Sequence, residues 1–343
     1  MFKKLILLLG NGLAAVTAAG LLARFVPPDI WWPPAVIALL LPGLILLTFL
    51  FALWGLYQRR WTAAFLPVVV SLAVLPMFNR LFSLSVSSAT EAPTAHVTLL
   101  TANVRMFKNA AFQSIDPALR TRFMKEAAPD ILLLQEAHDQ IVPAVQQATG
   151  LQRRHQPRKK TIATYADNVK FISDKFQRSG RVNGILVTDV MTDIGVIRVI
   201  NAHLQSNRIS DEADDIGSDA DVGKEIDRAE SMLRSYGRAA GIRAKQAEDI
   251  RRMVRESPHP VIVGGDFNDV PSSYTYQRIR TDRLRDAWAD HGFGIGTTFT
   301  GPLPFLRIDF LLVDKSLTIH EVERVETGFS DHRGLRVVVS KGE

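Results

Sequence analysis

Six short segments of the chain place an amide, a carboxylate or an imidazole at the edge of an apolar run. In the most informative of them, Val261–Asn268, a β-branched run ends in two glycines and is followed by Asp266 and Asn268. Residues i and i+2 of an extended segment point the same way, so this segment delivers a carboxylate and an amide to one spot. Gly-Gly-Asp is also common in turns, and both interpretations can hold at once. The pair is suited to chemistry on a phosphate or a metal ion.

The other five segments carry matching polar groups. Their candidate residues are Asn103, Glu136, His203, Asp309, Asp331 and His332. Loops at the ends of strands are where catalytic groups collect on a rigid scaffold. Side chains of these types can act on a phosphate or bind a metal ion, and this is the chemistry that the segments suggest.

Each of these side chains also has an ordinary structural interpretation. Asp309 could form a salt bridge with Arg307 at the edge of a strand, and a single histidine such as His203 is more often structural. Ser330 is expected to position the turn before His332 rather than to attack a substrate, since no nucleophile elbow is present. The grouping of the segments, more than any one residue, favours a catalytic site.

Alternating apolar and amphipathic segments predict the elements that must position these residues. The predicted strands are His96–Ala102, Asp130–Leu134, Gly184–Val190, Gly195–His203, Val261–Val263, Ile308–Val313 and Leu335–Ser340. Two helices are predicted, Asp116–Ala128 with Asp116 as its N-cap and Ala239–Glu256 before a Ser-Pro step. This order of elements predicts a mixed α/β sandwich built on two sheets.

In these segments the chain resembles the endonuclease/exonuclease/phosphatase superfamily. The segments that carry the resemblance, in the order of that family's motifs, are Leu100–Val104, Leu134–Glu136, Asn201–Leu204, Gly265–Asn268, Arg307–Phe310 and Ser330–His332. The resemblance covers about residues 96–340. It implies a four-layer α/β sandwich with two packed mixed β-sheets, and phosphoester hydrolysis that depends on Mg²⁺, with Mn²⁺ as a substitute.

The resemblance also implies roles for the metal and water groups. Glu136 is expected to ligate the metal ion, and Asn103 to support the same ion or its water shell. Asp309 would ligate the metal or polarise a histidine. Asp266 would orient and deprotonate the attacking water, and Asn268 would hold that water or a phosphate oxygen. These five residues would thus form the metal and water side of the site.

The two histidines are expected to act on the phosphate. His203 would donate a hydrogen bond to a non-bridging phosphate oxygen and so stabilise the transition state. His332 would contact the phosphate or the metal, and Asp331 could fix its tautomer as a carboxylate partner. Asp331 and His332 are thus predicted to be a hydrogen-bonded pair.

Three apolar stretches precede this domain within residues 1–82, at 5–26, 35–57 and 62–79. A helix needs about 20 apolar residues to cross a membrane, so the first two qualify well and the third is short. Lys3 and Lys4 precede the first stretch, Arg59 and Arg60 follow the second, and the connection between the two has no basic residue. The positive-inside rule then places the N-terminus in the cytoplasm.

This topology predicts an integral protein of the cell inner membrane. Three transmembrane helices would be followed by a linker at 83–95 and by a catalytic domain at 96–343 in the periplasm or outside the cell. A secretory signal peptide is the rival interpretation for residues 1–26. Two further apolar stretches follow directly, which favours the transmembrane interpretation.

The charge of the chain says little about its substrate. Of the formal net charge of +6, only +2 falls on residues 95–343, and the chain has no cysteine for disulfides or thiolate metal sites. Residues 153–160 form a basic cluster, whereas residues 207–221 form an acidic insert whose role the sequence leaves open. Nuclease activity is therefore expected from the resemblance alone. A phospholipid phosphodiesterase of the sphingomyelinase type and a non-catalytic binding module are the alternatives.

Overall fold

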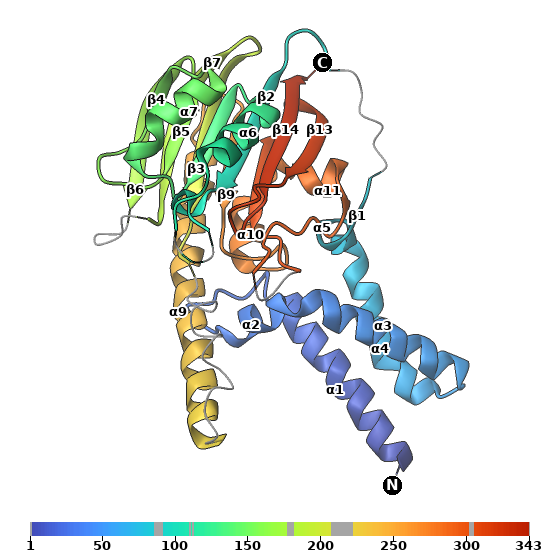
Figure 1. Cartoon of the computed structure of the whole chain (residues 1–343). Helices are drawn as coiled ribbons and strands as arrows, with labels where there is room; N and C mark the ends of the chain where they lie inside the picture. The colour runs from blue at the N-terminus through green and yellow to red at the C-terminus, as the bar shows by residue number, and fades with distance from the viewer. Residues whose placement is uncertain are drawn as a thin grey trace.

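Two six-stranded mixed β-sheets pack face to face in the C-terminal part of the chain (Figure 1). The computed structural model describes residues 2–85, 92–109, 111, 113–176, 182–206, 222–301 and 305–342. The first sheet has the order β10 (Leu284–Asp286), β12 (Asp309–Asp314), β9 (Val261–Asp266), β8 (Gly195–His203), β7 (Gly184–Thr192), β6 (Val169–Phe176). The second has the order β13 (Leu317–Val325), β14 (Gly334–Lys341), β2 (Val97–Asn103), β3 (Ile131–Gln135), β5 (Ala163–Ala166), β4 (Arg153–His155).

Helices cover the outer faces of both sheets. Helices α6 (Pro117–Ala127) and α7 (Val142–Thr149) bury their apolar sides on the second sheet, for example Met124 beside Leu132. Helices α9 (Val222–Arg255) and α10 (Tyr274–Ile279) cover the first sheet, with Ile250 among its contacts. A central cluster that includes Leu99 and Ile262 fills the space between the sheets. The result is the expected four-layer sandwich.

The predicted elements are present with adjusted ends. Strand β2 continues one residue past the prediction to Asn103, and the side chain of Asp116 caps α6 as predicted. Helix α9 begins at Val222 instead of at residue 239. Its first turns show mostly exposed polar side chains, so they lack the apolar period by which a buried helix is recognised. The acidic insert 207–221 lies outside the described residues.

The N-terminal segment forms α1 (Phe2–Leu22), α2 (Pro33–Leu39), α3 (Leu41–Tyr57), α4 (Trp61–Val74), a 3₁₀ turn (Leu75–Met77) and α5 (Phe78–Leu81). Within the described residues, Leu5–Leu22 and Trp61–Leu81 are long and apolar enough to cross a membrane. The predicted single span at 35–57 is a bent pair instead: α2 and α3 meet at 76°. If this pair counts as one span, the number of spans is three.

Pro42 accounts for the bend. A proline has no backbone N–H, and its ring clashes with the carbonyl four residues earlier. That carbonyl belongs to Ala38, and it accepts a hydrogen bond of 3.1 Å from the hydroxyl of Ser272 in the C-terminal domain. The break in the helix is therefore also a point of attachment between the two parts of the chain.

The N-terminal helices pack directly on the domain. Helix α2 lies beside α9, where Ala35, Tyr236 and Ala240 form one buried cluster (Figure 1). The start of the predicted linker is tied down as well, since β1 (Ser83–Leu84) pairs with β11 (Phe293–Gly294) just after the short helix α11 (Ala287–His291). The C-terminal domain thus packs against the helices that precede it.

Strand direction decides which end of the sandwich faces those helices. The C-terminus, which follows β14, lies at the end away from α1–α4 (Figure 1). Strand β2 is antiparallel to β14, so β2 ends at Asn103 on the side of the helices. Since Asn103 contacts the residue that ends β9, the candidate site residues lie at the end of the sandwich that faces the N-terminal helices.

Candidate active site

Three neighbouring strands of the first sheet bring an imidazole and two carboxylates into one row. In the register of β12, β9 and β8, Asp309 is paired with Asp266, and Asp266 is paired with His203. All three side chains are buried. A buried, apolar strand such as β9 holds its last residue rigidly, so the row has a fixed geometry.

The second sheet adds an amide and a further carboxylate from the ends of β2 and β3. The side-chain amide of Asn103 donates to Asp266 Oδ2 at 3.1 Å and to Glu136 Oε1 at 3.2 Å. Its oxygen accepts from the backbone N–H of Arg105 at 3.1 Å. In this arrangement Asn103 holds two carboxylates together across the sheets, and it presents its nitrogen rather than a metal-ligating oxygen to them.

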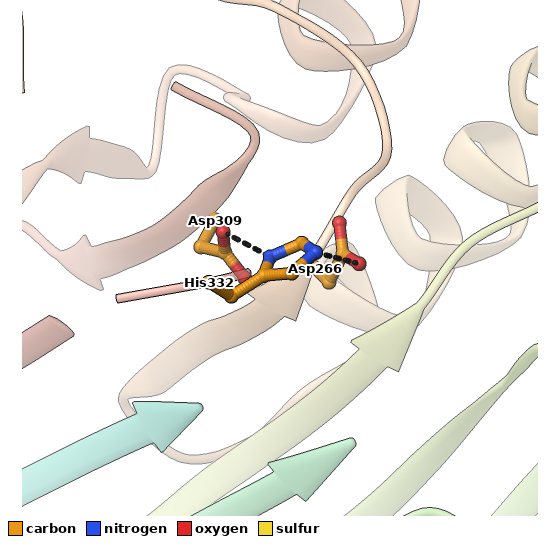
Figure 2. Close-up of side chains that lie close together, drawn as sticks. All are labelled: Asp266, Asp309 and His332. Carbon is orange, nitrogen blue, oxygen red and sulfur yellow. Dashed lines mark hydrogen bonds and ion pairs between the residues drawn. The ribbon is translucent and has the colours of Figure 1, made fainter. Parts of the chain in front are cut away.

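Asp266 lies at the centre of the site. The Nε2 atom of His203 is 3.6 Å from Asp266 Oδ2 and 3.8 Å from Glu136 Oε1. On the other side, Nε2 of His332 is 3.9 Å from the same Asp266 oxygen (Figure 2). One carboxylate oxygen therefore faces two imidazoles and the amides of Asn103 and Asn268.

His332 pairs with Asp309 and not with Asp331, so the predicted partner is wrong. The distance from His332 Nδ1 to Asp309 Oδ2 is 2.9 Å, and both side chains are buried (Figure 2). Asp331 lies 3.4 Å from Arg105 at the edge of the site. The alternative salt bridge between Asp309 and Arg307 is absent as well, because Arg307 pairs with Asp286 at 2.8 Å. Asp309 thus has the histidine-orienting geometry, which was one of its two predicted roles.

Charge inside the site stabilises a protonated His332. Burial alone lowers the pKa of this imidazole, but the carboxylates of Asp309 and Asp266 outweigh burial and raise the pKa to about 10. Burial raises the pKa of Asp309, which the His332 charge opposes. A divalent cation beside Asp266 would repel an imidazolium and lower the pKa of His332 again.

The backbone around the site adopts conformations that are unusual for these residue types. Glu136 and Asn268 both have φ of 51°, in the left-handed region, and such conformations cluster at functional sites. Gly265 has φ of 139°, and a Cβ there would lie 1.9 Å from the carbonyl oxygen of Ala202. Asn268 consequently folds back on Asp266: its backbone N–H donates to Oδ1 at 2.8 Å, and its amide donates to Oδ2 at 3.2 Å.

The hydrogen bonding of His203 is incomplete. Among the described residues, neither ring nitrogen of this buried histidine has a hydrogen-bond partner, because its two carboxylate neighbours are too distant. Unpartnered buried polar atoms are rare unless a ligand or ion completes them. Three side chains, Asp266, Asp309 and His332, also meet closely enough to hold one ion. The donor set, with Glu136 beside it, therefore fits a divalent cation together with an anionic substrate.

Two groups of supporting residues were missed in the sequence. Gln135 donates to Asn201 at 2.7 Å, and Asn201 donates to the Ala163 carbonyl at 2.9 Å, so these amides join the sheets beneath the site. Arg243 of α9 is fully buried and lies 3.1 Å from Asp269, next to Asn268. Gln135 and Asn201 lie inside the quoted motifs and Asp269 directly follows one, which was the available signal, whereas no pattern marked Arg243.

Asp309→Asn is expected to lower kcat at this site by about 10- to 100-fold, the usual effect of removing the carboxylate that orients a functional histidine. The amide cannot stabilise a charged His332, and it can hold the wrong tautomer. Asp331→Asn is the matched control, with an expected change of less than about threefold because its ion pair with Arg105 is partly open to solvent and lies at the edge of the site. Steady-state rates of both variants show which of the two carboxylates supports His332. Equal losses would contradict the assignment of Asp309 as the partner.

Comparisons with known proteins agree with this architecture. A sequence model of the Endonuclease/Exonuclease/phosphatase family matches residues 100–332, which include every predicted site residue. A second model, of a domain of unknown function, matches residues 3–81. No match was found among curated protein sequences.

Several solved structures are similar to part of this chain. An endonuclease/exonuclease/phosphatase from Beutenbergia cavernae is 17% identical, with 72% of each chain covered and a TM-score of 0.49. One from Bacteroides vulgatus is 16% identical, with 72% of this chain and 100% of that chain covered and a TM-score of 0.49. D. rerio TDP2, complexed with a single strand DNA product, is 15% identical, with 72% and 99% covered and a TM-score of 0.49.

Proposed function

The chain belongs to the endonuclease/exonuclease/phosphatase family of metal-dependent phosphoric ester hydrolases, and from this premise we propose that it hydrolyses phosphodiesters at the site around Asp266, with Mg²⁺ as its cofactor. The observation that carries the proposal is the meeting of Asp266 with Asn103, Glu136, His203 and His332 from both sheets. Acidic, amide and imidazole groups at such distances offer a cation site and hydrogen-bond donors for a phosphate.

The geometry suggests a role for each residue. Glu136, which is more exposed than Asp266 and Asp309, would hold Mg²⁺ together with Asp266 or through water. Mg²⁺ would neutralise charge on the phosphate and polarise its oxygens. Asp266, fixed by Asn103 and Asn268, would orient the attacking water and accept its proton.

The histidines complete the site from opposite sides. His203 would donate to a non-bridging phosphate oxygen, which gives a partner to its otherwise unpaired ring nitrogen. His332, held by Asp309, would donate to the phosphate from the other side of Asp266. Donors that are positioned before the reaction stabilise developing negative charge without reorganisation.

We place this site at a membrane. The apolar helices Leu5–Leu22 and Trp61–Leu81 support anchoring, and the distribution of Lys3, Lys4, Arg59 and Arg60 favours a catalytic domain outside the cytoplasm. A C-terminal phosphatase reporter should be active only in the periplasm, and reporter activity in the cytoplasm would refute this orientation. Nuclease activity, which the family resemblance favours, stays a prediction.

Glu136→Gln tests the proposed role of the metal ligand. The full-length chain in detergent should hydrolyse bis-p-nitrophenyl phosphate in Mg²⁺, and the variant should need a Mg²⁺ concentration about 10- to 100-fold higher for half-maximal rate. The matched control is Glu126→Gln, an exposed glutamate on α6 that pairs with Arg122. If the variant and the wild-type chain show the same Mg²⁺ dependence, Glu136 is not a metal ligand.

A further inference from the structure

An apolar groove runs along the N-terminal helices beneath the catalytic end of the sandwich. Its first part is a cavity of about 480 Å³ between the α2–α3 bend and the domain, and its second is a cavity of about 560 Å³ along α3, α4 and α5. The two cavities share Pro42, Leu46, Leu81 and Ile295 as lining residues, so they adjoin each other. Each has a volume typical of a small-molecule site.

The upper wall of the groove is made by the segments that carry the catalytic carboxylates. Val270 and Pro271, in the loop that follows Asn268, line it on one side. Leu306 and Arg307, directly before β12 and Asp309, line it as well. The groove thus reaches both segments that deliver the central carboxylates of the site.

One aromatic ring links this apolar region to the catalytic histidine. Phe299 is buried in a cluster with Ala38 of α2 and Val270. Its ring also packs edge-on against His332, with 5.3 Å between the ring centroids. Phe299 thus contacts His332 and also belongs to the buried cluster that includes α2, which links the site to the N-terminal helices.

The groove is open on its apolar sides. Leu46 is 57% exposed and Leu75 64% exposed on the helices, and Phe305 of the domain is 67% exposed. Contiguous exposed apolar surface of this kind is unfavourable in water and usually marks a binding site or a membrane contact. Helices expected to cross a bilayer are surrounded by hydrocarbon chains, and these chains are the occupants that such a groove would take up.

From this arrangement we infer that the substrate is a membrane lipid phosphodiester, with a hydrocarbon chain in the apolar groove and its phosphate at Asp266 and His203. The inference rests on the proposed function and names its substrate class. In the reaction, a water oxygen forms a bond to phosphorus while the bond from phosphorus to one ester oxygen breaks. One proton of the water passes to Asp266, and the leaving oxygen ends as an alcohol after taking up a proton.

The same features disfavour a nucleic acid as the main substrate. Binding to a phosphate backbone depends on neutralisation by clustered positive charge, yet residues 95–343 carry a formal net charge of only +2. The end of the sandwich with the site residues also faces α2, as the contact between Ser272 and Ala38 shows. A large polyanion would have to approach next to helices that are expected to lie in or on a membrane.

Two glycines provide a matched pair of variants. Gly43 of α3 lines the groove, and Gly12 of α1 does not; both are exposed, and a Cβ at either meets no atom within 4 Å. Gly43→Phe should therefore fill the groove without disturbing the fold, and Gly12→Phe adds the same ring elsewhere on the apolar helices. The full-length chain is placed in nanodiscs for all measurements.

The experiment compares lipids with their chainless counterparts in Mg²⁺. The nanodiscs contain phosphatidylcholine, phosphatidylethanolamine and phosphatidylglycerol, and the soluble substrates are the matching glycerophosphodiesters, bis-p-nitrophenyl phosphate, DNA and RNA. At least one lipid should react with a kcat/KM at least about tenfold above its chainless form, since burying two methylene groups alone is worth roughly that factor. Gly43→Phe should lower this ratio at least about tenfold, by the same estimate. Gly12→Phe should leave every rate within about twofold of the wild-type rate.

The possible failures are distinguishable. If the wild-type chain hydrolyses none of the substrates in Mg²⁺, the proposed function falls and the substrate inference falls with it. If bis-p-nitrophenyl phosphate is hydrolysed but lipids are no better than chainless diesters, or if DNA or RNA reacts faster than any lipid, only the substrate inference is overturned. A lipid preference that survives Gly43→Phe would overturn the assignment of the groove.

Discussion

Asp266→Asn is expected to lower kcat for bis-p-nitrophenyl phosphate by about 10³-fold, within the range for loss of a general base. The carboxylate is buried at the centre of the site, and its Oδ2 accepts hydrogen bonds from both Asn103 and Asn268. An asparagine of the same shape keeps at most one acceptor oxygen, cannot take the proton of a water and is a weaker cation ligand. Steady-state kinetics in saturating Mg²⁺ measure the loss.

Asp193→Asn is the control for this variant. Asp193 is an exposed aspartate in the turn between β7 and β8, at the opposite end of β8 from His203. Its rate should stay within about twofold of the wild-type rate, as is usual for surface substitutions. The melting temperatures of both variants in EDTA establish that they are folded. If folded Asp266→Asn keeps more than about a tenth of the wild-type kcat, Asp266 is not the base.

Removal of divalent cations is expected to lower the wild-type rate by about 10³-fold or more, because a bound cation supplies several kcal/mol of charge stabilisation in the transition state. Asp266 and Glu136 are held close together by the shared amide of Asn103, so without a cation the site repels a phosphate. Added Mg²⁺ or Mn²⁺ should restore the rate. A wild-type chain that keeps its rate after exhaustive dialysis against EDTA would refute metal dependence.

Much of the site could be predicted because each polar residue adjoins a recognisable strand. Asp266 and His203 follow apolar runs whose strand character is plain, and parallel pairing of β8 with β9 then places both at the same edge. The partner of His332 could not be predicted in the same way. Asp309 is 23 positions away from it, and the two meet only through tertiary structure. Asp331 is adjacent in the chain, but it lies toward Arg105.

The contact between the N-terminal helices and the C-terminal domain could not be predicted from the sequence pattern either. The apolar run 35–57 predicts one helix, whereas Pro42 frees the Ala38 carbonyl for Ser272 and the chain bends there. That contact depends on tertiary structure and leaves no periodic signal. The contact matters for function because it holds the catalytic end of the sandwich against the N-terminal helices. This placement favours a lipid substrate over the nucleic acid substrate that the family resemblance suggests.

The most direct test of the central claim is the rate of bis-p-nitrophenyl phosphate hydrolysis as Mg²⁺ is titrated back into the EDTA-treated full-length chain, with wild type and Asp266→Asn measured side by side. A metal-dependent phosphodiesterase centred on Asp266 predicts a wild-type rate that rises about 10³-fold with Mg²⁺ and a variant rate that stays near the metal-free level. A wild-type rate that does not respond to Mg²⁺, or a variant that responds as fully as the wild type, would contradict it.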